Sequence, residues 1–359
     1  MQSLDRKALI RRLISRLMLC ALAVTFSVIV FKQQKQRNLA MEQLPQKHSG
    51  AQEVVVPQGV PHTFNTFVFN TPCSFIFTGD KEKCAASARE AMALCRKVND
   101  VLNRFDPESE ISRFNAAPAD TDFACSELFM QALLAAKKAY GDSRGCFDVT
   151  VAPLLNYWKK GGTGNDEEFA KLKAATGFNG LQIFPETRII RKTHAGTQLD
   201  FGGLAKGFAL DLVKDIADAP HIEEALVNLG GNLYLRQKAD SPFAGEVAIR
   251  CPFGGNIPAA TVTYCNGRFI STSSFAERGR HIVHPATGKP AESAFASVTA
   301  VTAGGSDSDV FSTSVFIGGR ELAESLVQNN PGTAFALITS KDKAPELLGD
   351  IALKQTDSQ

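Results

Sequence analysis

The sequence lacks several of the compositional features by which common classes of protein are recognised. Its formal net charge is only +2, and much of its positive charge lies near the N-terminus, so it lacks the basic excess typical of nucleic-acid-binding domains. We therefore expect no nucleic-acid partner. No internal repeat or low-complexity tract is present. The 359 residues, 44% hydrophobic and 21% charged, are typical of one large globular domain or two small ones.

Paired cysteine motifs are also absent. No Cys-x-x-Cys occurs, so a structural zinc site has no support. Seven of the eight cysteines follow the N-terminal apolar segment, and their scatter is unlike a disulfide framework, so we expect buried free thiols. The eight are Cys20, Cys73, Cys84, Cys95, Cys125, Cys146, Cys251 and Cys265. The single tryptophan, Trp158, is expected to pack in the core.

The apolar run from Leu17 to Phe31 is short of the ~20 residues that cross a bilayer. Basic residues flank it on both sides, and neither a small-x-small cleavage site nor a lipoprotein cleavage site accompanies it. We expect residues 1–32 to form a cytoplasmic tail and an uncleaved signal anchor in the bacterial inner membrane. Residues 33–60 would be a linker to a periplasmic domain. The alternative is a buried N-terminal helix, which the flanking charges disfavour.

Periodicity along the rest of the chain predicts a mixture of helices and short strands. Helical spacing is expected over Lys81–Leu102, Ser126–Tyr140, Glu167–Ala175, Leu204–Ala217, Val310–Ile317 and Arg320–Gln328. Short strands are expected at Leu181–Phe184, Arg188–Lys192, Thr197–Phe201, Ala225–Asn228, Leu233–Arg236, Glu246–Cys251, Ala260–Tyr264, Arg268–Ser271, Ser297–Ala303 and Phe335–Ile338. Asn103–Asn115 is predicted to be a polar loop, and residues 346–359 a polar tail. This mixture indicates an α+β fold with mixed β-sheets and packed helices.

The most informative stretch is Ser306–Thr313, which places Asp309 and Thr313 four residues apart. If the chain is helical from Val310, both side chains lie along one face near the helix N-terminus. A carboxylate and a hydroxyl are oxygen ligands of the kind that Mg²⁺ requires. On these residues alone, an N-cap role for Asp309 is equally compatible with the pattern.

A second stretch, Leu199–Gly207, is a glycine-rich turn that leads into a predicted helix. Gly202 and Gly203 permit a tight turn, backbone N–H groups there can receive phosphate, and Lys206 can reach it as a point charge. The alternative is a plain turn followed by a solvated lysine. A magnesium ligand pair together with a phosphate-binding turn suggests chemistry on a diphosphate or a nucleotide.

Several motifs, taken in order, resemble those of the FAD:protein FMN transferase family, often called ApbE or thiamine biosynthesis lipoprotein-like. The resemblance covers roughly residues 65–340. Its pieces are Asn103–Asn115, Gly145–Leu154, Asp200–Gly207 with Asp211, Val227–Gly231, Ser271–Ser273, His281–Gly288, and Asp309 with Thr313. It implies one ApbE-like (T-fold-like) domain over residues 61–345, with an FAD cleft between a helical and a β-rich half.

The resemblance also implies an activity. FAD would be the substrate, Mg²⁺ the cofactor, and a Thr or Ser hydroxyl of a target flavoprotein would attack the FMN-side phosphorus so that AMP leaves. The targets would be flavin-acceptor subunits or domains of membrane redox systems. Two alternatives stay open: a Mg²⁺-dependent FAD pyrophosphatase that yields FMN and AMP, and a non-catalytic FAD-binding protein.

The resemblance assigns the candidate site residues. Asp309 and Thr313 would hold Mg²⁺ with a backbone carbonyl near Ala205, and His281 would accept the hydroxyl proton or else orient a phosphate or a loop. Candidate contacts to the nucleotide are Asn70, Thr71, Ser112, Asn115, Gly202, Gly203, Lys206, Asp211, Gly230, Gly231, Thr272, Ser273 and Thr287. Asp211 is equally compatible with a cap or an exposed helix charge, and Gly230-Gly231 with a plain turn. Asp148 and Thr150 are interpreted as a structural pair.

Three positions depart from the family's usual motifs. Phe69-Asn70-Thr71 stands in place of Met-Gly-Thr, His284 replaces the first residue of Asp-Pro-x-Thr-Gly, and Ser274 replaces the glycine of Thr-Ser-Gly. These changes concern flavin contacts and loop geometry, whereas the predicted metal pair is intact.

Overall fold

The computed structural model describes residues 60–238, 247–254, 259–262, 266–275, 282–341 and 343–350, and the backbone of 353–355. The predicted anchor, the predicted linker up to residue 59, and the candidate base His281 lie outside these residues. Within the described part of the chain, no helix combines the length and the apolar character that a membrane span requires.

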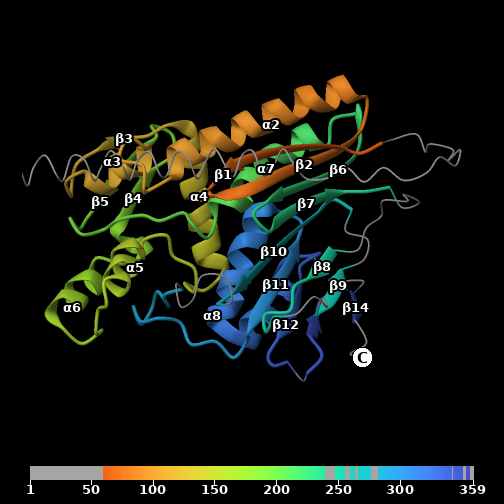
Figure 1. The fold of residues 1–359 in the computed structure, drawn as a ribbon. Helices are drawn as coiled ribbons and strands as arrows, with labels where there is room; N and C mark the ends of the chain where they lie inside the picture. The colour runs from red at the N-terminus through yellow and green to blue at the C-terminus, as the bar shows by residue number, and fades with distance from the viewer. Residues whose placement is uncertain are drawn as a thin grey trace, which may run out of the picture. The chain divides into compact units, whose positions relative to one another are not determined.

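An eight-stranded antiparallel sheet forms the centre of the fold (Figure 1). Its strands, in spatial order, are β1 (His62–Val68), β2 (Thr71–Gly79), β6 (Ile222–Leu229), β7 (Asn232–Arg236), β10 (Arg268–Ser274), β11 (Ser297–Thr302), β12 (Ala334–Ile338) and β13 (Glu346–Leu348). Buried and more exposed residues alternate along β2, and this alternation gives the sheet a buried face. Cys73, Phe75 and Phe77 are buried while the residues between them are more exposed, as the two-residue period of a strand requires.

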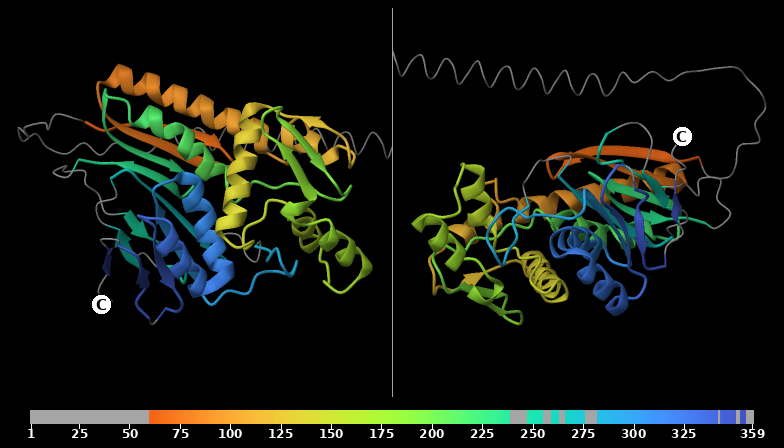
Figure 2. Two further views of the ribbon diagram at one scale, coloured as in Figure 1. Left: turned by 180° about the vertical axis from the view of Figure 1, so that it is seen from behind. Right: turned by 90° about the horizontal axis from the view of Figure 1, so that it is seen from below.

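Helices cover one face of this sheet. Figures 1 and 2 show α2 (Lys81–Leu102) and α7 (Ala205–Ala217) side by side over β1, β2 and β6, and α8 (Gly305–Asn329) against β10 and β11. The main hydrophobic core lies between these layers and includes Phe75, Phe77, Phe311 and Phe335. α4 (Glu127–Asp142) packs on the same assembly and begins at the Ser126 cap, whose hydroxyl accepts the Phe129 N–H.

A three-stranded sheet covers the opposite face of the large sheet. It consists of β14 (Leu353–Gln355), β9 (Ala260–Val262) and β8 (Val247–Ile249). A smaller apolar cluster lies between the two sheets, with Ile249 and Val262 on one side and Ile270 and Ile338 on the other. The large sheet is therefore buried on both faces at this end.

A second small sheet stands at the other end of the structure (Figure 1). It pairs β3 (Phe123–Ala124), β5 (Ile189–Lys192) and β4 (Leu181–Phe184), and it is accompanied by α3 (Glu110–Ala116), α5 (Ala152–Lys159), α6 (Glu167–Ala174) and the 3₁₀ turn η1 (Phe178–Gly180). Lys192 is buried, and its ammonium donates to the carbonyls of Asn115 at 2.9 Å and Thr197 at 3.1 Å. Burial lowers the pKa of Lys192, and these carbonyls, together with that of Phe114 at 3.4 Å, accept from its ammonium.

The structure confirms the predicted α+β class but corrects several elements. The predicted loop Asn103–Asn115 contains α3, which Ser109 caps through a hydrogen bond from the Ser112 N–H. The predicted strand Thr197–Phe201 is irregular apart from a single bridge between Gln198 and Val151. Residues 346–359 are not simply a polar tail, because β13 pairs with β12 and β14 pairs with β9.

The helix that carries Asp309 also differs from the expectation. The two predicted helices Val310–Ile317 and Arg320–Gln328 are both present within α8, but the first of them begins five residues earlier, at Gly305. A non-helical residue, Gly319 with φ +78°, marks the junction between them. Asp309 therefore lies inside the helix, and the N-cap alternative for this residue is wrong.

The described cysteines are free thiols, as predicted, but Cys146 and Cys251 are only half-buried, whereas burial was expected for all of them. Cys73, Cys84, Cys95 and Cys125 are buried, and burial raises the pKa of the Cys95 thiol to about 12. Such thiols stay protonated and unreactive near neutral pH. Cys20 and Cys265 lie outside the described residues.

The backbones of α7 and α8 touch at two glycines. A Cβ atom on Gly207 would lie 2.2 Å from the carbonyl oxygen of Gly305, and one on Gly305 would lie 2.3 Å from that of Gly207. Asp211, one turn further along α7, accepts the N–H groups of Gly305 at 2.5 Å and Ser306 at 2.8 Å. Asp211 thus caps α8 with both carboxylate oxygens, which is one of the roles the sequence left open.

We expect Gly207→Ala to destabilise the protein by about 1–3 kcal/mol, because the added methyl group forces the two helix backbones apart. Urea unfolding monitored by circular dichroism measures this change. Gly141→Ala is the matched control: Gly141 is exposed in α4 with nothing within 4 Å of a new Cβ, so we expect a gain of roughly 0.5–1 kcal/mol. A Gly207→Ala variant as stable as the parent would show that α7 and α8 are not in close contact.

Candidate functional site

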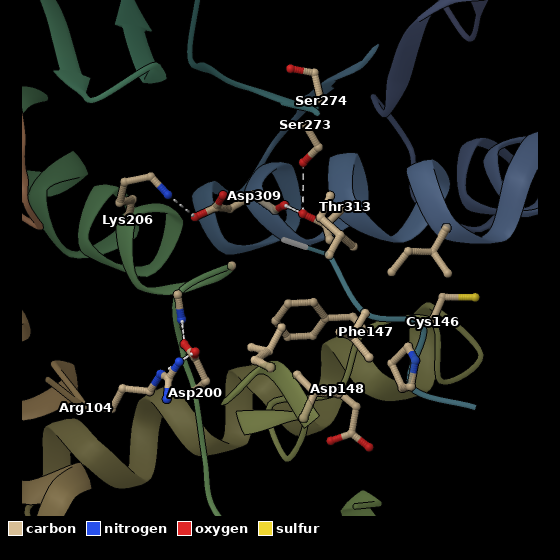
Figure 3. Close-up of a pocket in the computed structure, with 18 of the residues that line it drawn as sticks. Arg104, Cys146, Phe147, Asp148, Asp200, Lys206, Ser273, Ser274, Asp309 and Thr313 are labelled. Atoms are coloured by element: carbon tan, nitrogen blue, oxygen red, sulfur yellow. Dashed lines mark hydrogen bonds and ion pairs between the residues drawn. The ribbon is translucent and has the colours of Figure 1, made fainter. Parts of the chain in front are cut away.

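A cavity of about 540 Å³ lies where the loop before α3, the start of α7, strand β10 and helix α8 meet. Its wall includes Arg104 and Phe105, part of α5, the segment Asp200–Lys206, Gly230, Thr272–Ser274 and residues of α8. Figure 3 shows two acidic side chains, Asp200 and Asp309, on different walls, each beside a basic side chain. The N-terminal helical half and the C-terminal β-rich half both contribute to the cavity, as expected for a cleft between them.

Two carboxylates hold the glycine-rich segment at its ends. Asp200 Oδ1 accepts the Gly202 N–H at 2.6 Å, and Asp309 Oδ2 accepts the Gly207 N–H at 3.1 Å. Asp200 Oδ2 lies 2.6 Å from Arg104 Nε, and the two side chains are only 15% and 11% exposed. The turn is thereby fixed before any ligand arrives, with the Gly202 N–H already engaged.

Asp309 and Thr313 lie on the face of α8 that borders the cavity. Asp309 is 6% exposed, and its own backbone carbonyl lies 3.3 Å from the Thr313 hydroxyl. The Ser273 hydroxyl on β10 lies 2.9 Å from the hydroxyl of Thr313. The predicted pair is therefore brought together on one helix face, with a third hydroxyl beside it.

The donor set fits a hard divalent cation. A nearly buried carboxylate and neighbouring hydroxyl oxygens suit Mg²⁺, which takes oxygen ligands and prefers few charged ones. Among the described residues, no group of three or more His, Cys, Asp or Glu side chains is placed to hold a metal, so a softer or all-carboxylate site is not formed there. Ala205 opens α7 two residues before Gly207, whose N–H donates to Asp309, and the Ala205 carbonyl as a third ligand stays a prediction.

Six of the predicted nucleotide contacts line the cavity. They are Gly202, Gly203, Lys206, Gly230, Thr272 and Ser273. Lys206 Nζ lies 3.4 Å from Asp309 Oδ2, and the Thr272 hydroxyl lies 2.8 Å from that of Thr299. These residues converge from α7, the β6–β7 turn and β10, which are far apart in sequence.

The other predicted contacts lie outside the cavity wall, and the structure gives most of them a supporting contact. The Asn115 amide clamps the backbone of Leu199 through two hydrogen bonds, at 2.7 Å and 3.0 Å, just before Asp200. A Cβ atom on Gly230 would lie 2.4 Å from the Thr71 side chain, so Thr71 packs directly behind the cavity wall. Asn70 turns the β1–β2 hairpin with a positive φ.

Three further predicted contacts are also local. The Ser112 hydroxyl accepts that of Ser109, the Gly231 N–H donates to Asn228, and the Thr287 hydroxyl accepts the Lys289 N–H. Asp211 caps α8, as described above. Any direct contact of these residues with a nucleotide stays a prediction.

The sequence matches the model of the ApbE family over residues 69–338, which is well over half of the chain. The chain belongs to the ApbE family. Proteins named FAD:protein FMN transferase are similar to it in sequence. One from Vibrio cholerae is 27% identical over 263 residues, covering 69% of this chain and 78% of the relative. One from Treponema pallidum is 28% identical over 287 residues, covering 72% and 78%.

Solved structures of ApbE proteins have the same fold. The flavinyl transferase ApbE from Pseudomonas stutzeri, in its apo form, superimposes with a TM-score of 0.70 at 24% identity, covering 82% of this chain and 96% of that one. The flavin transferase ApbE from Vibrio cholerae gives a TM-score of 0.68 at 23% identity, covering 81% and 97%. The expected ApbE-like architecture is therefore confirmed.

Two cavity residues of this ApbE-family protein were missed from the sequence. Arg104 belongs to the motif Asn103–Asn115, yet no local spacing links it to Asp200, 96 positions away in the chain. Trp158 was expected in the core, but it is half-buried on the cavity wall, where its indole N–H donates to the Gly288 carbonyl at 2.7 Å. This bond ties α5 to the loop that supplies Ile282, Val283 and Pro285 to the cavity.

Asp148 and Thr150 form the structural pair that the sequence suggested. Asp148 accepts the Thr150 N–H at 2.8 Å and hydroxyl at 2.7 Å, and its other oxygen accepts the Phe178 N–H at 3.2 Å. Burial raises the pKa of Asp148, while these hydrogen bonds act in the opposite direction. The pair fixes the turn that precedes α5.

We expect Arg104→Met to cost about 3 kcal/mol of unfolding free energy, because it leaves the mostly buried Asp200 carboxylate without its counter-charge. Arg191→Met removes a more exposed ion pair with Asp122 and is the matched control, with an expected loss of less than ~1 kcal/mol. Chemical denaturation measures both. The double variant Arg104→Met, Asp200→Asn should recover part of the loss, and equal effects of the two arginine substitutions would contradict the assignment.

Proposed function

We propose that this protein is an FAD:protein FMN transferase, which moves the FMN part of FAD onto a Thr or Ser hydroxyl of a target flavoprotein and releases AMP. Membership of the ApbE family and the similarity to proteins of that name support the proposal. The observation that carries it is the convergence of Asp309, Thr313 and the turn Gly202–Lys206 on one cavity. This set provides oxygen ligands for a cation beside a cradle for a diphosphate.

Mg²⁺ is the cofactor that we propose, with Asp309, Thr313 and the carbonyl of Ala205 as its protein ligands. When bound, it would neutralise charge on the diphosphate. Lys206 and the N-terminus of α7 would hold the diphosphate from the other side. Gly203 and Gly230 both line the cavity, and at Gly230 a Cβ atom would collide with Thr71 behind the wall, so a glycine lets the β6–β7 turn pack there.

The transfer exchanges the phosphoanhydride bond of the diphosphate for a phosphoester bond to the target. The hydroxyl oxygen of the target bonds to the FMN-side phosphorus, the bond from that phosphorus to the AMP oxygen breaks, and AMP leaves with the electron pair. We propose His281 as the group that takes the hydroxyl proton. His284 is less suited to this role, because its Nδ1 already accepts the Ala286 N–H at 3.2 Å within its own turn.

We expect Asp309→Ala to abolish the transfer while FAD still binds, because the substitution removes the metal carboxylate while Asp200 still holds the start of the diphosphate turn. The full chain is incubated with FAD, Mg²⁺ and a candidate flavin-acceptor domain, and covalent flavin fluorescence is read on the denatured acceptor. Trp158, the only tryptophan, lines the cavity, so bound FAD should quench its fluorescence in both proteins.

The outcomes separate the candidate functions. A fluorescent acceptor that is lost with EDTA and with Asp309→Ala supports the transferase. Release of FMN and AMP without a labelled acceptor would instead identify a pyrophosphatase, and tryptophan quenching without either product would identify a binding protein. Full transfer by Asp309→Ala would contradict the metal assignment.

We also propose that residues 1–32 anchor the protein in the bacterial inner membrane, with the catalytic domain on the periplasmic side. The support is the apolar run Leu17–Phe31 between basic flanks. The acceptor would then be a flavin-binding part of a membrane redox system on the same side.

Alkaline extraction should leave the full chain in the membrane pellet, whereas deletion of residues 1–32 should release it into the supernatant, because the apolar run is then missing. Protease added to spheroplasts should degrade the catalytic domain but not a cytoplasmic marker. Extraction of the full chain into the supernatant, or protection of the domain from protease, would contradict this location.

A further inference from the structure

Lys206 and Asp309 form an ion pair on the cavity wall. Lys206 Nζ lies 3.4 Å from Asp309 Oδ2, and the side chains are only 13% and 9% exposed. The same oxygen also accepts the Gly207 N–H. A carboxylate this far from water needs charge compensation, and Lys206 supplies it in the ligand-free protein.

The other cations of the cavity are engaged elsewhere. Arg104 is paired with Asp200 at 2.6 Å, and the Lys159 ammonium lies over the Phe105 ring, 5.5 Å from its centroid. Among the described residues, Lys206 is therefore the cation that balances Asp309. Its 3.4 Å separation is longer than the roughly 2.7–2.9 Å of a tight charge-assisted hydrogen bond, so the ammonium is held loosely.

We propose that Lys206 is a placeholder for the metal ion: it balances Asp309 while the site holds no metal and is displaced when the metal binds. This inference rests on the proposed function, because it takes Asp309 as a ligand of that metal. A divalent cation and an ammonium cannot share one buried carboxylate without strong repulsion. Lys206 has a flexible four-carbon stem, so it can leave Asp309 without moving the backbone of α7.

The diphosphate of FAD is the anion to which the displaced ammonium can turn, since it would lie in the same cavity. Metal binding alone must break the Lys206–Asp309 pair without a new partner for the lysine. Metal binding together with FAD gives the lysine that partner. The two ligands should therefore strengthen each other's binding, and by the same factor in each direction.

This coupling sets an order of events at the site. Free metal at cellular concentration competes with an internal cation and binds weakly, so the loaded state forms mainly when FAD is present. The Lys206–Asp309 pair keeps the buried carboxylate neutralised between turnovers. It also limits the occupation of an empty cavity by adventitious divalent cations.

The test is direct titration of the full chain with Mn²⁺, followed by the electron paramagnetic resonance signal of the free ion, with and without FAD. We expect Lys206→Met to bind Mn²⁺ about tenfold more tightly than the parent in the absence of FAD, because the competing charge is gone. The factor by which FAD improves Mn²⁺ binding should shrink in the same variant. An affinity equal to or weaker than that of the parent would overturn the proposal.

Two further variants serve as controls. Lys159→Met removes the same charge from the same cavity without touching Asp309, and its Mn²⁺ affinity should stay within about twofold of the parent. Lys206→Arg keeps the competing charge and should bind Mn²⁺ no more tightly than the parent. A tenfold gain in either control would mean that general cavity charge, and not the Lys206–Asp309 pair, governs affinity.

A stability measurement gives an independent readout that still applies if Lys206→Met folds poorly. Without metal, Lys206→Gln should unfold at lower temperature than the parent, and added Mn²⁺ should restore its stability more than it stabilises the parent. Asp309→Asn distinguishes the two proposals. If Asp309→Asn binds Mn²⁺ normally, the metal assignment of the proposed function fails; if it loses Mn²⁺ binding while Lys206→Met binds as the parent does, only the placeholder fails.

Discussion

The contact between the backbones of α7 and α8 is the constraint on which the cavity depends. The two helices approach so closely at Gly207 and Gly305 that neither position has room for a methyl group. This approach places the start of α7 against the second turn of α8, and so puts Lys206 beside Asp309. Asp211 then fixes the direction of α8 by capping its first N–H groups. Without this contact, the glycine-rich turn would not lie beside Asp309 and Thr313.

Acidic side chains organise the candidate site. Asp200 and Asp309 each accept a backbone N–H from the segment between them, and each has a basic partner. Such paired, mostly buried charges contribute little net stability, but leaving one partner alone is costly. The segment is therefore held in a single arrangement, and the electrostatic cost of that arrangement is already met in the ligand-free protein. Preorganisation of this kind is what phosphoryl transfer requires, because catalysis there depends mainly on positioning and charge.

The sequence predicted those parts of the molecule that local patterns determine. The bounds of α2 were predicted to the residue, because apolar positions recur at helical spacing over 22 residues and Asp80 caps the start. The short helix α3 was missed, because seven residues among turn formers carry too little periodicity. β13 and β14 were missed as well, because edge strands of three residues are too short to show a periodic pattern and are defined by their neighbours.

In the candidate site, too, local patterns predicted some residues and missed others whose role depends on tertiary contacts. The spacing of Asp309 and Thr313 correctly placed both on one helix face, whereas their assignment as a metal pair came from the family resemblance and stays a prediction. The partnership of Arg104 with Asp200 depends on tertiary structure, and sequence spacing contains no information about it. Trp158 was misplaced because an indole ring is both apolar and a hydrogen-bond donor. The apolar character predicted the core, whereas the donor draws the ring to the Gly288 carbonyl at the cavity wall.

The large separation along the chain between the two sides of the cavity has a consequence for biosynthesis. Arg104 and the glycine-rich turn emerge from the ribosome long before α8, and β6 must pair with β2 across roughly 150 intervening residues. A partly synthesised chain contains the glycine-rich segment but lacks Asp309, which holds one end of that segment. If the chain is threaded across a membrane during synthesis, no nucleotide can be held in a finished site until α8 has also crossed. The enzyme is then assembled only on the side where its last third arrives.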